Sequence, residues 1–243
     1  ITYSKVRVSY AQVGNDVPSY ATNPVAYFID NQNGSRANTT GPKPGTYLKP
    51  EDNRSFEVGT EWSLFNNRVG LDFTYYINNN FRQYIQIPVS GSSTGNLSTW
   101  YLNSGNIKNT GVELSVFVTP VKNQIMSWTS TINYAFNKNR VVKIADADLG
   151  VSQDYFVISS SSNLFSSYIK EGGSWGDIYG RFFKRDANGV IVVDNTGAPI
   201  KGSDPNSDIG NANLKKLGNP NPRFTVGWNN SFNVKNFSLN LLF

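Results

Sequence analysis

The chain of 243 residues contains no cysteine and no histidine. Without cysteine it can form neither disulfide bonds nor thiolate sites, and without histidine it lacks the commonest general base and metal ligand. Charged residues make up only 16% of the chain, and the net charge of +5 includes no run of lysine or arginine. Nucleic-acid binding therefore has little support, and an enzyme would have to depend on carboxylates, serine, lysine or tyrosine.

Long hydrophobic runs are absent as well. The chain has no stretch of 18 apolar residues, and its mean hydropathy is −0.39, which excludes a helical membrane bundle. These values do not exclude a membrane β-barrel, because half of each barrel strand faces water. No signal peptide is recognisable. The chain begins and ends inside predicted strands, so we expect an internal fragment of a longer protein.

What the sequence does contain is a period of two, clearest in residues 54–77. Apolar or large side chains occupy the even positions of 56–64, with Thr60 as the weak member, and then the odd positions of 69–77. This period predicts strands with one apolar and one polar face. A two-residue turn at Asn66-Asn67 would keep both apolar sets on one face, because it requires this change of parity. The predicted pairs are Leu64 with Val69, Trp62 with Leu71, and Phe56 with Ile77.

The polar face of this hairpin carries like charges opposite each other. In the predicted register Glu61 faces Asp72, an arrangement that destabilises a strand pair unless water or a basic partner lies beside it. The strands are also about 10 to 12 residues long, which suits tilted membrane-spanning strands. We expect Lys5 or Arg7 of the first strand to share this face and to lie near Glu57 or Glu61.

The same alternation predicts seven antiparallel strands. They cover about residues 3–13, 54–64, 69–77, 111–119, 128–137, 224–232 and 237–243. Long connections at about 14–53, 78–99 and 138–222 alternate with short ones at 66–67, 120–127 and 234–236. Compact soluble domains seldom have such long loops, whereas outer-membrane barrels alternate short periplasmic turns with long extracellular loops. The predicted fold class is all-β: an antiparallel transmembrane β-barrel segment, with residues 1–243 as one partial barrel domain.

The main alternative is a structural or adhesive surface protein with a soluble β-sandwich core, whose strands also alternate. It accounts poorly for the strand lengths and for the asymmetry of the loops. Aromatic residues near strand ends would fit a membrane-interface girdle. The candidates are Trp62, Tyr75, Trp128, Trp228 and Phe232.

The long loops give weaker signals. Residues 14–52 are rich in Asn, Gly and Pro and are expected to hold little regular structure. Residues 84–87 are expected to extend a strand above the membrane. Within the insertion at 138–222, which we place at the opposite end from Asn66-Asn67, the Asn-Gly and Thr-Gly pairs predict a hairpin near 181–202.

Four segments resemble the SusC/RagA-like TonB-dependent outer-membrane transporters. They are LKPEDNRSFEVGTEW at 48–62, FNNRVGLDFTYY at 65–76, NSGNIKNTGVEL at 103–114 and LGNPNPRFTVGWNNSF at 217–232. They occur in the order of the family, with comparable spacing, and correspond to the C-terminal half of its barrel without the last few strands.

This resemblance implies a plugged barrel of roughly 22 strands in the outer membrane of a Gram-negative cell. It implies uptake of large nutrients, such as oligosaccharides or peptides, without a cofactor. The implied partners are outer-membrane lipids, a SusD-like surface lipoprotein, and the TonB complex. TonB would be contacted through an N-terminal part that, like the plug, lies outside this chain.

No catalytic constellation is visible. The carboxylates of Glu57, Glu61, Asp72 and Glu113 would share the lumen face. One interpretation is a carboxylate pair for glycoside hydrolysis; the favoured interpretation is a hydrated barrel wall that contacts a plug.

Cation binding in the loops is also considered. Residues 186–189 and 194–197 resemble cation loops but are better explained as turns flanking a small strand. Asp204 and Asp208 lie in a segment that corresponds to a plausible calcium loop of the family, but the dense spacing of oxygen ligands is missing. We therefore predict no metal site.

Aromatic residues in the loops are the candidate substrate-binding residues, because sugar rings stack on aromatic faces and exposed loop aromatics often mark binding surfaces. The candidates are Trp100, Tyr101, Trp175, Tyr179, Phe182 and Phe183. The alternative is that these side chains hold the long loops together or contact the lipoprotein.

Overall fold

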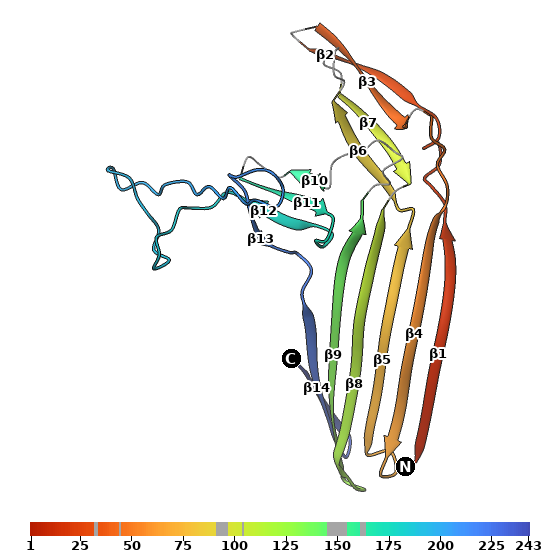
Figure 1. Ribbon diagram of the computed structural model, residues 1–243. Helices are drawn as coiled ribbons and strands as arrows, with labels where there is room; N and C mark the ends of the chain where they lie inside the picture. The colour runs from red at the N-terminus through yellow and green to blue at the C-terminus, as the bar shows by residue number, and fades with distance from the viewer. Residues whose placement is uncertain (32–33, 44, 91–96, 104, 145–154, 161–163) are drawn as a thin grey trace.

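The computed structural model describes residues 1–31, 34–43, 45–90, 97–103, 105–144, 155–160 and 164–243. The regular elements of these residues are all strands, β1 to β15, arranged in three sheets. The largest sheet stands below two smaller sheets at one of its ends (Figure 1). Within the described residues, no helix has the length and apolar character needed to cross a membrane.

The largest sheet contains seven antiparallel strands in sequence order. They are β1 (Tyr3–Asn15), β4 (Glu51–Leu64), β5 (Val69–Phe81), β8 (Asn106–Lys122), β9 (Met126–Lys143), β14 (Phe224–Val234) and β15 (Phe237–Leu242). All seven predicted strands are confirmed. Several are longer than predicted, since β5 and β9 continue into the segments that were assigned to loops.

The register of the β4–β5 hairpin is confirmed, including Trp62 opposite Leu71 and Glu61 opposite Asp72. Asn66 and Asn67 have φ angles of 53° and 62°, and the N–H of Arg68 donates to the carbonyl of Phe65 at 3.2 Å. The same N–H also lies 3.1 Å from the carbonyl of Leu64. The turn is centred on Asn66-Asn67 with positive φ at both, as predicted, but it is wider than a two-residue turn. Phe65 itself also has a positive φ of 53°, which the sequence did not indicate.

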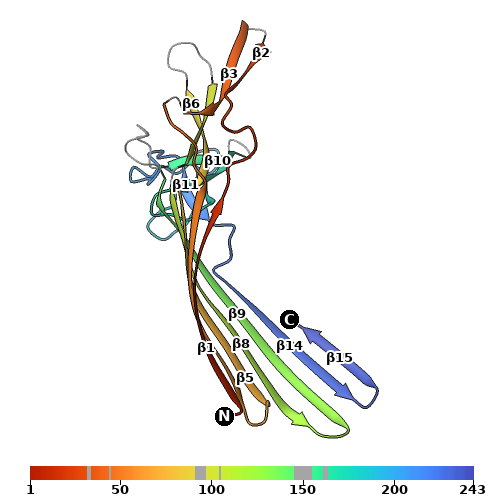
Figure 2. The ribbon, with the colours of Figure 1, turned by 90° about the vertical axis from the view of Figure 1, so that its right-hand side faces the viewer.

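The apolar face of the seven-stranded sheet remains uncovered. Among the residues that the structure describes, Val8 is 65% exposed, Ile132 49% and Val226 56%. The sheet curves and its short turns gather at one end (Figure 2). A β-sandwich would bury this face against a second sheet, so that alternative is wrong, and the face suits contact with lipid.

On the opposite, polar face, two large side chains lie flat over glycines of the neighbouring strand. Phe117 lies opposite Gly70, and Tyr76 lies opposite Gly111. A Cβ atom at residue 111 would lie 2.3 Å from Cζ of Tyr76, and one at residue 70 would lie 2.0 Å from the ring of Phe117. Only glycine leaves room for these rings against the strand.

The first two long loops form a sheet of their own. Its order is β2 (Val25–Asn31), β3 (Gly34–Pro42), β7 (Leu97–Asn103) and β6 (Tyr84–Ser90), with β3 parallel to β7. The expectation that residues 14–52 hold little regular structure is therefore wrong. Residues 84–87 pair with β7 instead of extending β5. Each loop forms a hairpin of its own, β2 with β3 and β6 with β7, and the parallel pairing of β3 with β7 joins the two hairpins, which local composition does not reveal.

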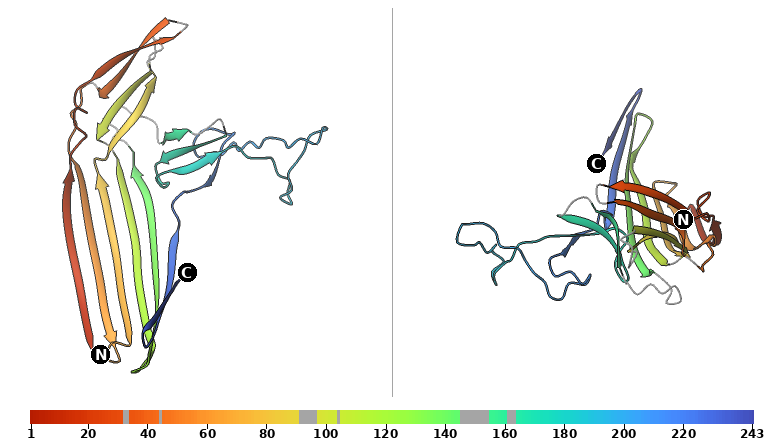
Figure 3. Two further views of the ribbon diagram at one scale, coloured as in Figure 1. Left: turned by 180° about the vertical axis from the view of Figure 1, so that it is seen from behind. Right: turned by 90° about the horizontal axis from the view of Figure 1, so that it is seen from above.

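The third long loop carries the remaining sheet, with β10 (Tyr155–Ser160), β11 (Phe165–Lys170), β12 (Asp177–Gly180) and β13 (Lys215–Gly218). It lies at the opposite end of the large sheet from the Asn66-Asn67 turn, as predicted (Figure 3). Residues 145–154 and 161–163 of the insertion lie outside the described residues.

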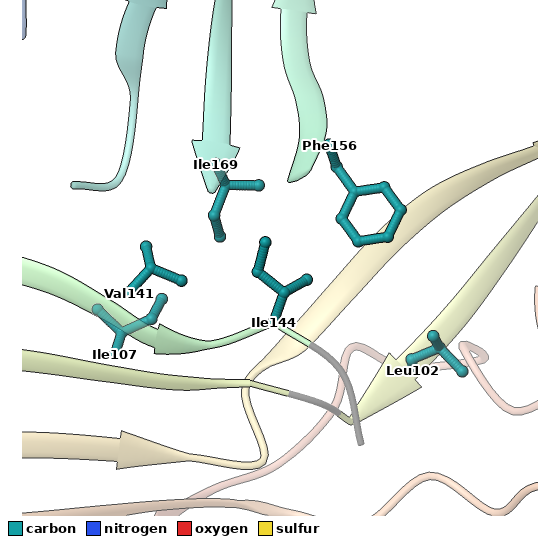
Figure 4. Close-up of a cluster of buried hydrophobic side chains, with 6 residues drawn as sticks. All are labelled: Leu102, Ile107, Val141, Ile144, Phe156 and Ile169. Atoms are coloured by element: carbon teal, nitrogen blue, oxygen red, sulfur yellow. The ribbon is translucent and has the colours of Figure 1, made fainter. Parts of the chain in front are cut away.

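A hydrophobic cluster joins the three sheets. Side chains from β7, β8, β9, β10 and β11 point toward one another in it (Figure 4). Its members are Leu102, Ile107, Val141, Ile144, Phe156 and Ile169. Val141 is separated by an even number of residues from Asn137 on β9, so the cluster lies on the polar-face side of the large sheet. The loops thus fold toward the polar side of the wall.

The segment at 181–202 projects from the third sheet (Figure 1). The predicted turns are present, since Gly189 and Gly197 have φ angles of 82° and 85°. These turns do not belong to a single hairpin, so that expectation is wrong. The N–H of Lys184 donates to the carbonyl of Ile200, the N–H of Ile200 donates to the carbonyl of Val192, and the N–H of Val192 donates to the carbonyl of Lys184. The three short segments around these residues are therefore joined to one another by backbone hydrogen bonds.

Candidate functional site: the polar face and its extracellular mouth

An ion pair crosses three strands on the polar face. Arg7 of β1 lies opposite Gly59 of β4, and a Cβ atom at residue 59 would lie 2.7 Å from Nε of Arg7. Because glycine leaves that space open, the guanidinium reaches β5. There its Nη2 donates to Oδ1 of Asp72 at 2.5 Å and to Oγ1 of Thr74 at 2.7 Å.

This arrangement relieves the repulsion between Glu61 and Asp72. Arg7 neutralises Asp72, and Lys5 lies directly opposite Glu61 in the register. The prediction that a cation of the first strand shares this face and lies near Glu57 or Glu61 is confirmed by Lys5, whereas the ion pair of Arg7 is with Asp72, which was not the expected partner. Both side chains of that ion pair are about 40% exposed (38% and 43%), so water screens it and it contributes little to stability; it serves mainly to position the groups.

The remaining carboxylates of this face, Glu57 and Glu113, are exposed and make no ion pair among the described residues. An open hollow of about 320 Å³ lies beside Glu113. Polar side chains from five strands line it, including Arg7, Asp72, Thr74, Glu113, Asn133 and Thr225. The surface is a hydrated wall that can accept polar groups.

A second hollow, of about 530 Å³, lies toward the end of β9 where the long loops gather. Asparagine side chains and charges dominate its lining, with Asn137, Asn139, Asp177, Lys216, Asn219 and Asn221 among its residues. Oδ1 of Asn139 accepts a hydrogen bond from the N–H of Trp175 at 2.8 Å, which fixes the loop over the strand.

Asp177 is the central group of this mouth, and sequence reasoning missed it. Its side chain is 1% exposed. It accepts hydrogen bonds from Nζ of Lys216 at 2.5 Å, Nδ2 of Asn219 at 2.8 Å and the N–H of Ser174 at 3.1 Å. The only signal in the sequence was the GNPNP segment, which begins with Gly218. The carboxylate ties the loop before β12 to β13 and to the chain that enters β14.

The six candidate aromatic residues lie in different places. Trp100 and Trp175 are half-buried against the hydrophobic cluster that joins the sheets. Tyr101 packs its ring against Tyr84 at 5.3 Å between centroids. Tyr179 is 1% exposed. In this structure the first three brace the loops, while part of their surface remains accessible.

Phe182 and Phe183 begin the projecting segment. Phe182 is half-buried over Gly202, and Nζ of Lys215 lies 5.9 Å from its ring centroid. Phe183 is 50% exposed. Of the six candidates, Phe183 therefore presents the most open ring.

The acidic residues Asp194 and Asp208 form hydrogen bonds and an ion pair with other loop residues. Burial, together with the hydrogen bond that its hydroxyl donates to Oδ2 of Asp208 at 2.9 Å, raises the pKa of Tyr179. Asp208 also pairs with Lys170 at 3.4 Å. Asp194 accepts hydrogen bonds from the hydroxyl and the N–H of Thr196, which lower its pKa. Within the described residues, no cluster of three or more acidic side chains could hold a metal ion.

Sequence comparison places these features in a known family. The model of the family described as "TonB dependent receptor-like, beta-barrel" matches residues 2–241. TonB-dependent receptor P3 of Formosa agariphila is 31% identical over 209 residues, which cover 81% of this chain and 20% of the receptor. SusC of Bacteroides thetaiotaomicron is 24% identical over 152 residues, or 60% of this chain and 15% of SusC.

Structural comparison agrees. The RagAB peptide importer in its "open-open" state superposes with a TM-score of 0.73 and 19% identity, over 98% of this chain and 25% of that chain. Its "closed-closed" state gives a TM-score of 0.69. At this identity the likeness shows the fold alone. The chain spans between about 15% and 25% of the length of the relatives it matches.

Proposed function

Because the chain belongs to the TonB-dependent receptor-like β-barrel family, we propose that it is part of an outer-membrane transporter that imports large nutrients. The observation that carries this proposal is a seven-stranded sheet with an exposed apolar face and an opposite face of polar side chains. Such a sheet is a barrel wall between lipid and a watery lumen. The whole chain is one partial barrel domain, with external loops in the three long connections.

Oligosaccharides or peptides are the proposed cargo. SusC and RagAB are the similar proteins that support this choice. Cargo would meet the asparagine-lined mouth first, and then the polar wall around Arg7 and Asp72. The exposed parts of Trp100, Phe182 and Phe183 would stack on sugar rings or apolar side chains. Transport requires no catalytic group in this wall, so the chain is not an enzyme.

Two partners are proposed with it. A SusD-like surface lipoprotein would cover the extracellular mouth, where the long loops gather. The TonB complex would supply energy through the N-terminal part of the parent protein. The projecting segment at 181–202 is exposed along most of its length, which makes it the part of this chain most available to a lipoprotein above the barrel.

A deletion strain of the Gram-negative host tests the function. The gene for the parent protein is deleted and then restored, and uptake of fluorescent oligosaccharides and fluorescent peptides is measured separately. We expect the restored protein in the outer-membrane fraction and uptake of one cargo class. Recovery of the parent protein in the soluble fraction would contradict the proposal. So would uptake that, for each of the two cargo classes, is the same in the strains with and without the gene.

A further inference from the structure

A row of positive charge crosses the outer face of the sheet, directly above its apolar side chains. The register aligns Arg54 of β4 with Asn79 of β5, Asn79 with Lys108 of β8, and Lys108 with Arg140 of β9. Lys138 lies two residues from Arg140 along β9. All of these positions have the parity of the apolar residues on their strands, so they share the outer face.

Three of these cations are uncompensated. Arg54 is already paired, since its Nη2 lies 2.7 Å from Oδ2 of Asp52. Lys108, Lys138 and Arg140 make no ion pair in the part of the chain that the structure describes. Lys138 and Arg140 are exposed, and Lys108 is partly exposed. The free positive charge is therefore concentrated on β8 and β9.

The free cations form a compact group with one hydroxyl. Lys108 faces Arg140, and Thr110 faces Lys138. Facing side chains on adjacent antiparallel strands have Cβ atoms about 5 Å apart, and neighbours along one face of a strand are about 7 Å apart. Four hydrogen-bond donors thus surround a spot the size of a phosphate group, and the three charges suit an anion.

The height of this group matches the boundary of a membrane. Lys108 lies ten residues along β8 from Val118, which faces Val69 beside the short turn. Ten residues rise about 33 Å along a strand, or about 25 Å along the membrane normal at a tilt of about 40°. The apolar band of outer-membrane barrels is about 25 Å tall. The cations therefore lie where acyl chains end and headgroups begin.

We propose that Lys108, Lys138 and Arg140, with Thr110, bind the phosphorylated headgroup of an outer-leaflet lipid. Below the group the outer face of β8 is apolar from Val112 to Val118, so acyl chains attached to the headgroup have a surface to lie on. A free anion would use the charges but not this surface. The inference rests on the proposed place of the sheet in the barrel wall, and it assigns the extracellular end of β8 and β9 a lipid partner.

The test uses the full-length parent protein in detergent and measures bound lipid by native mass spectrometry. The probes are lipid A, dephosphorylated lipid A and inorganic phosphate. We expect the triple variant K108Q/K138Q/R140Q to bind lipid A about tenfold or more weakly than the native protein, because each cation near a membrane surface adds to the attraction. Dephosphorylated lipid A should bind weakly to both proteins.

A matched control removes three exposed cations from the projecting region, as R181Q/K184Q/K201Q, and should bind lipid A as the native protein does. Equal binding by the two triple variants would overturn the proposal, as would displacement of lipid A by inorganic phosphate at similar concentration. Heat-modifiable migration on gels checks that each variant is folded. Absence of the native protein from the outer membrane would instead overturn the proposed function.

Discussion

At the scale of single residues, three polar side chains within the apolar band of the outer face each accept a hydrogen bond from a tryptophan. Nε1 of Trp62 donates to Oγ1 of Thr60 at 2.6 Å, and Nε1 of Trp128 donates to Oδ1 of Asn230 at 3.1 Å. Nε1 of Trp228 donates to Oγ of Ser130 at 2.8 Å. In hydrocarbon no water is present to satisfy such groups. These three interruptions of the apolar pattern are therefore hydrogen-bond partners of the indoles.

Replacing Trp128 with Phe tests this pairing. Asn230 is only 5% exposed, so loss of its donor should leave a buried acceptor unsatisfied and destabilise the folded protein by about 1–3 kcal/mol. The measurement is urea unfolding of the full-length protein in lipid vesicles. The double variant W128F/N230L removes both partners and should recover most of the loss. A double variant no more stable than W128F would show that the hydrogen bond is not the cause.

At the scale of elements, the extracellular mouth depends on a buried carboxylate that three segments share. Asp177 accepts from the loop at Ser174, from β13 through Lys216, and from Asn219 beyond β13. None of these segments is held by a long ladder, since β12 and β13 have four residues each. The hydrogen bonds of the Asp177 side chain are therefore expected to determine how stably these loop segments pack against β9.

The variant K216M should loosen these elements without unfolding the sheet. Removing the cation leaves Asp177 buried with two neutral partners, and uncompensated buried charges are destabilising. We expect faster hydrogen exchange at residues 171–180 and 215–219 of the full-length protein, and unchanged exchange in β4 and β5. The matched control is K215M, whose exposed side chain does not contact Asp177. Equal acceleration in both variants would refute the assigned role.

At the scale of the whole molecule, the two faces of the large sheet meet different solvents. Neighbouring residues along one strand therefore report opposite environments. Val226 lies on the outer face at the middle of the apolar band, in the row of Tyr134, whereas Thr225 lines the hollow of the polar face. This difference follows from the strand period and does not depend on loop structure.

Lysine substitution at these two positions should have unequal effects. Lysine at a lipid-facing site near the bilayer midplane costs about 2–4 kcal/mol, because the charge must leave water. We expect V226K to destabilise the full-length protein by about this amount in vesicle unfolding experiments, and T225K to change stability by less than about 1 kcal/mol. A larger loss in T225K would reverse the assignment of lumen and lipid faces.

The strands of the wall, the register of residues 54–77 and the two faces could all be predicted from the order of the residues alone. These depend on a period of two and on the parity change across Asn66-Asn67, which are local properties that a neighbouring strand can only reinforce. The family resemblance likewise came from contiguous segments. The direction of the long insertion followed from the alternation of short and long connections.

The arrangement of the loops could not be predicted in this way, because it depends on how the folded chain packs. The hairpin of β2 and β3 becomes part of a larger sheet because β7 from another loop pairs with residues 39–42, and Tyr179 is buried because Ile209 and Tyr168 cover it. The side chain of Arg7 reaches Asp72 because Gly59, on the strand between them, has no side chain to block it. Each outcome depends on contacts between segments far apart in the chain. The free energies of these contacts come from burial and hydrogen bonding in the folded protein, so they cannot be predicted from local periodicity.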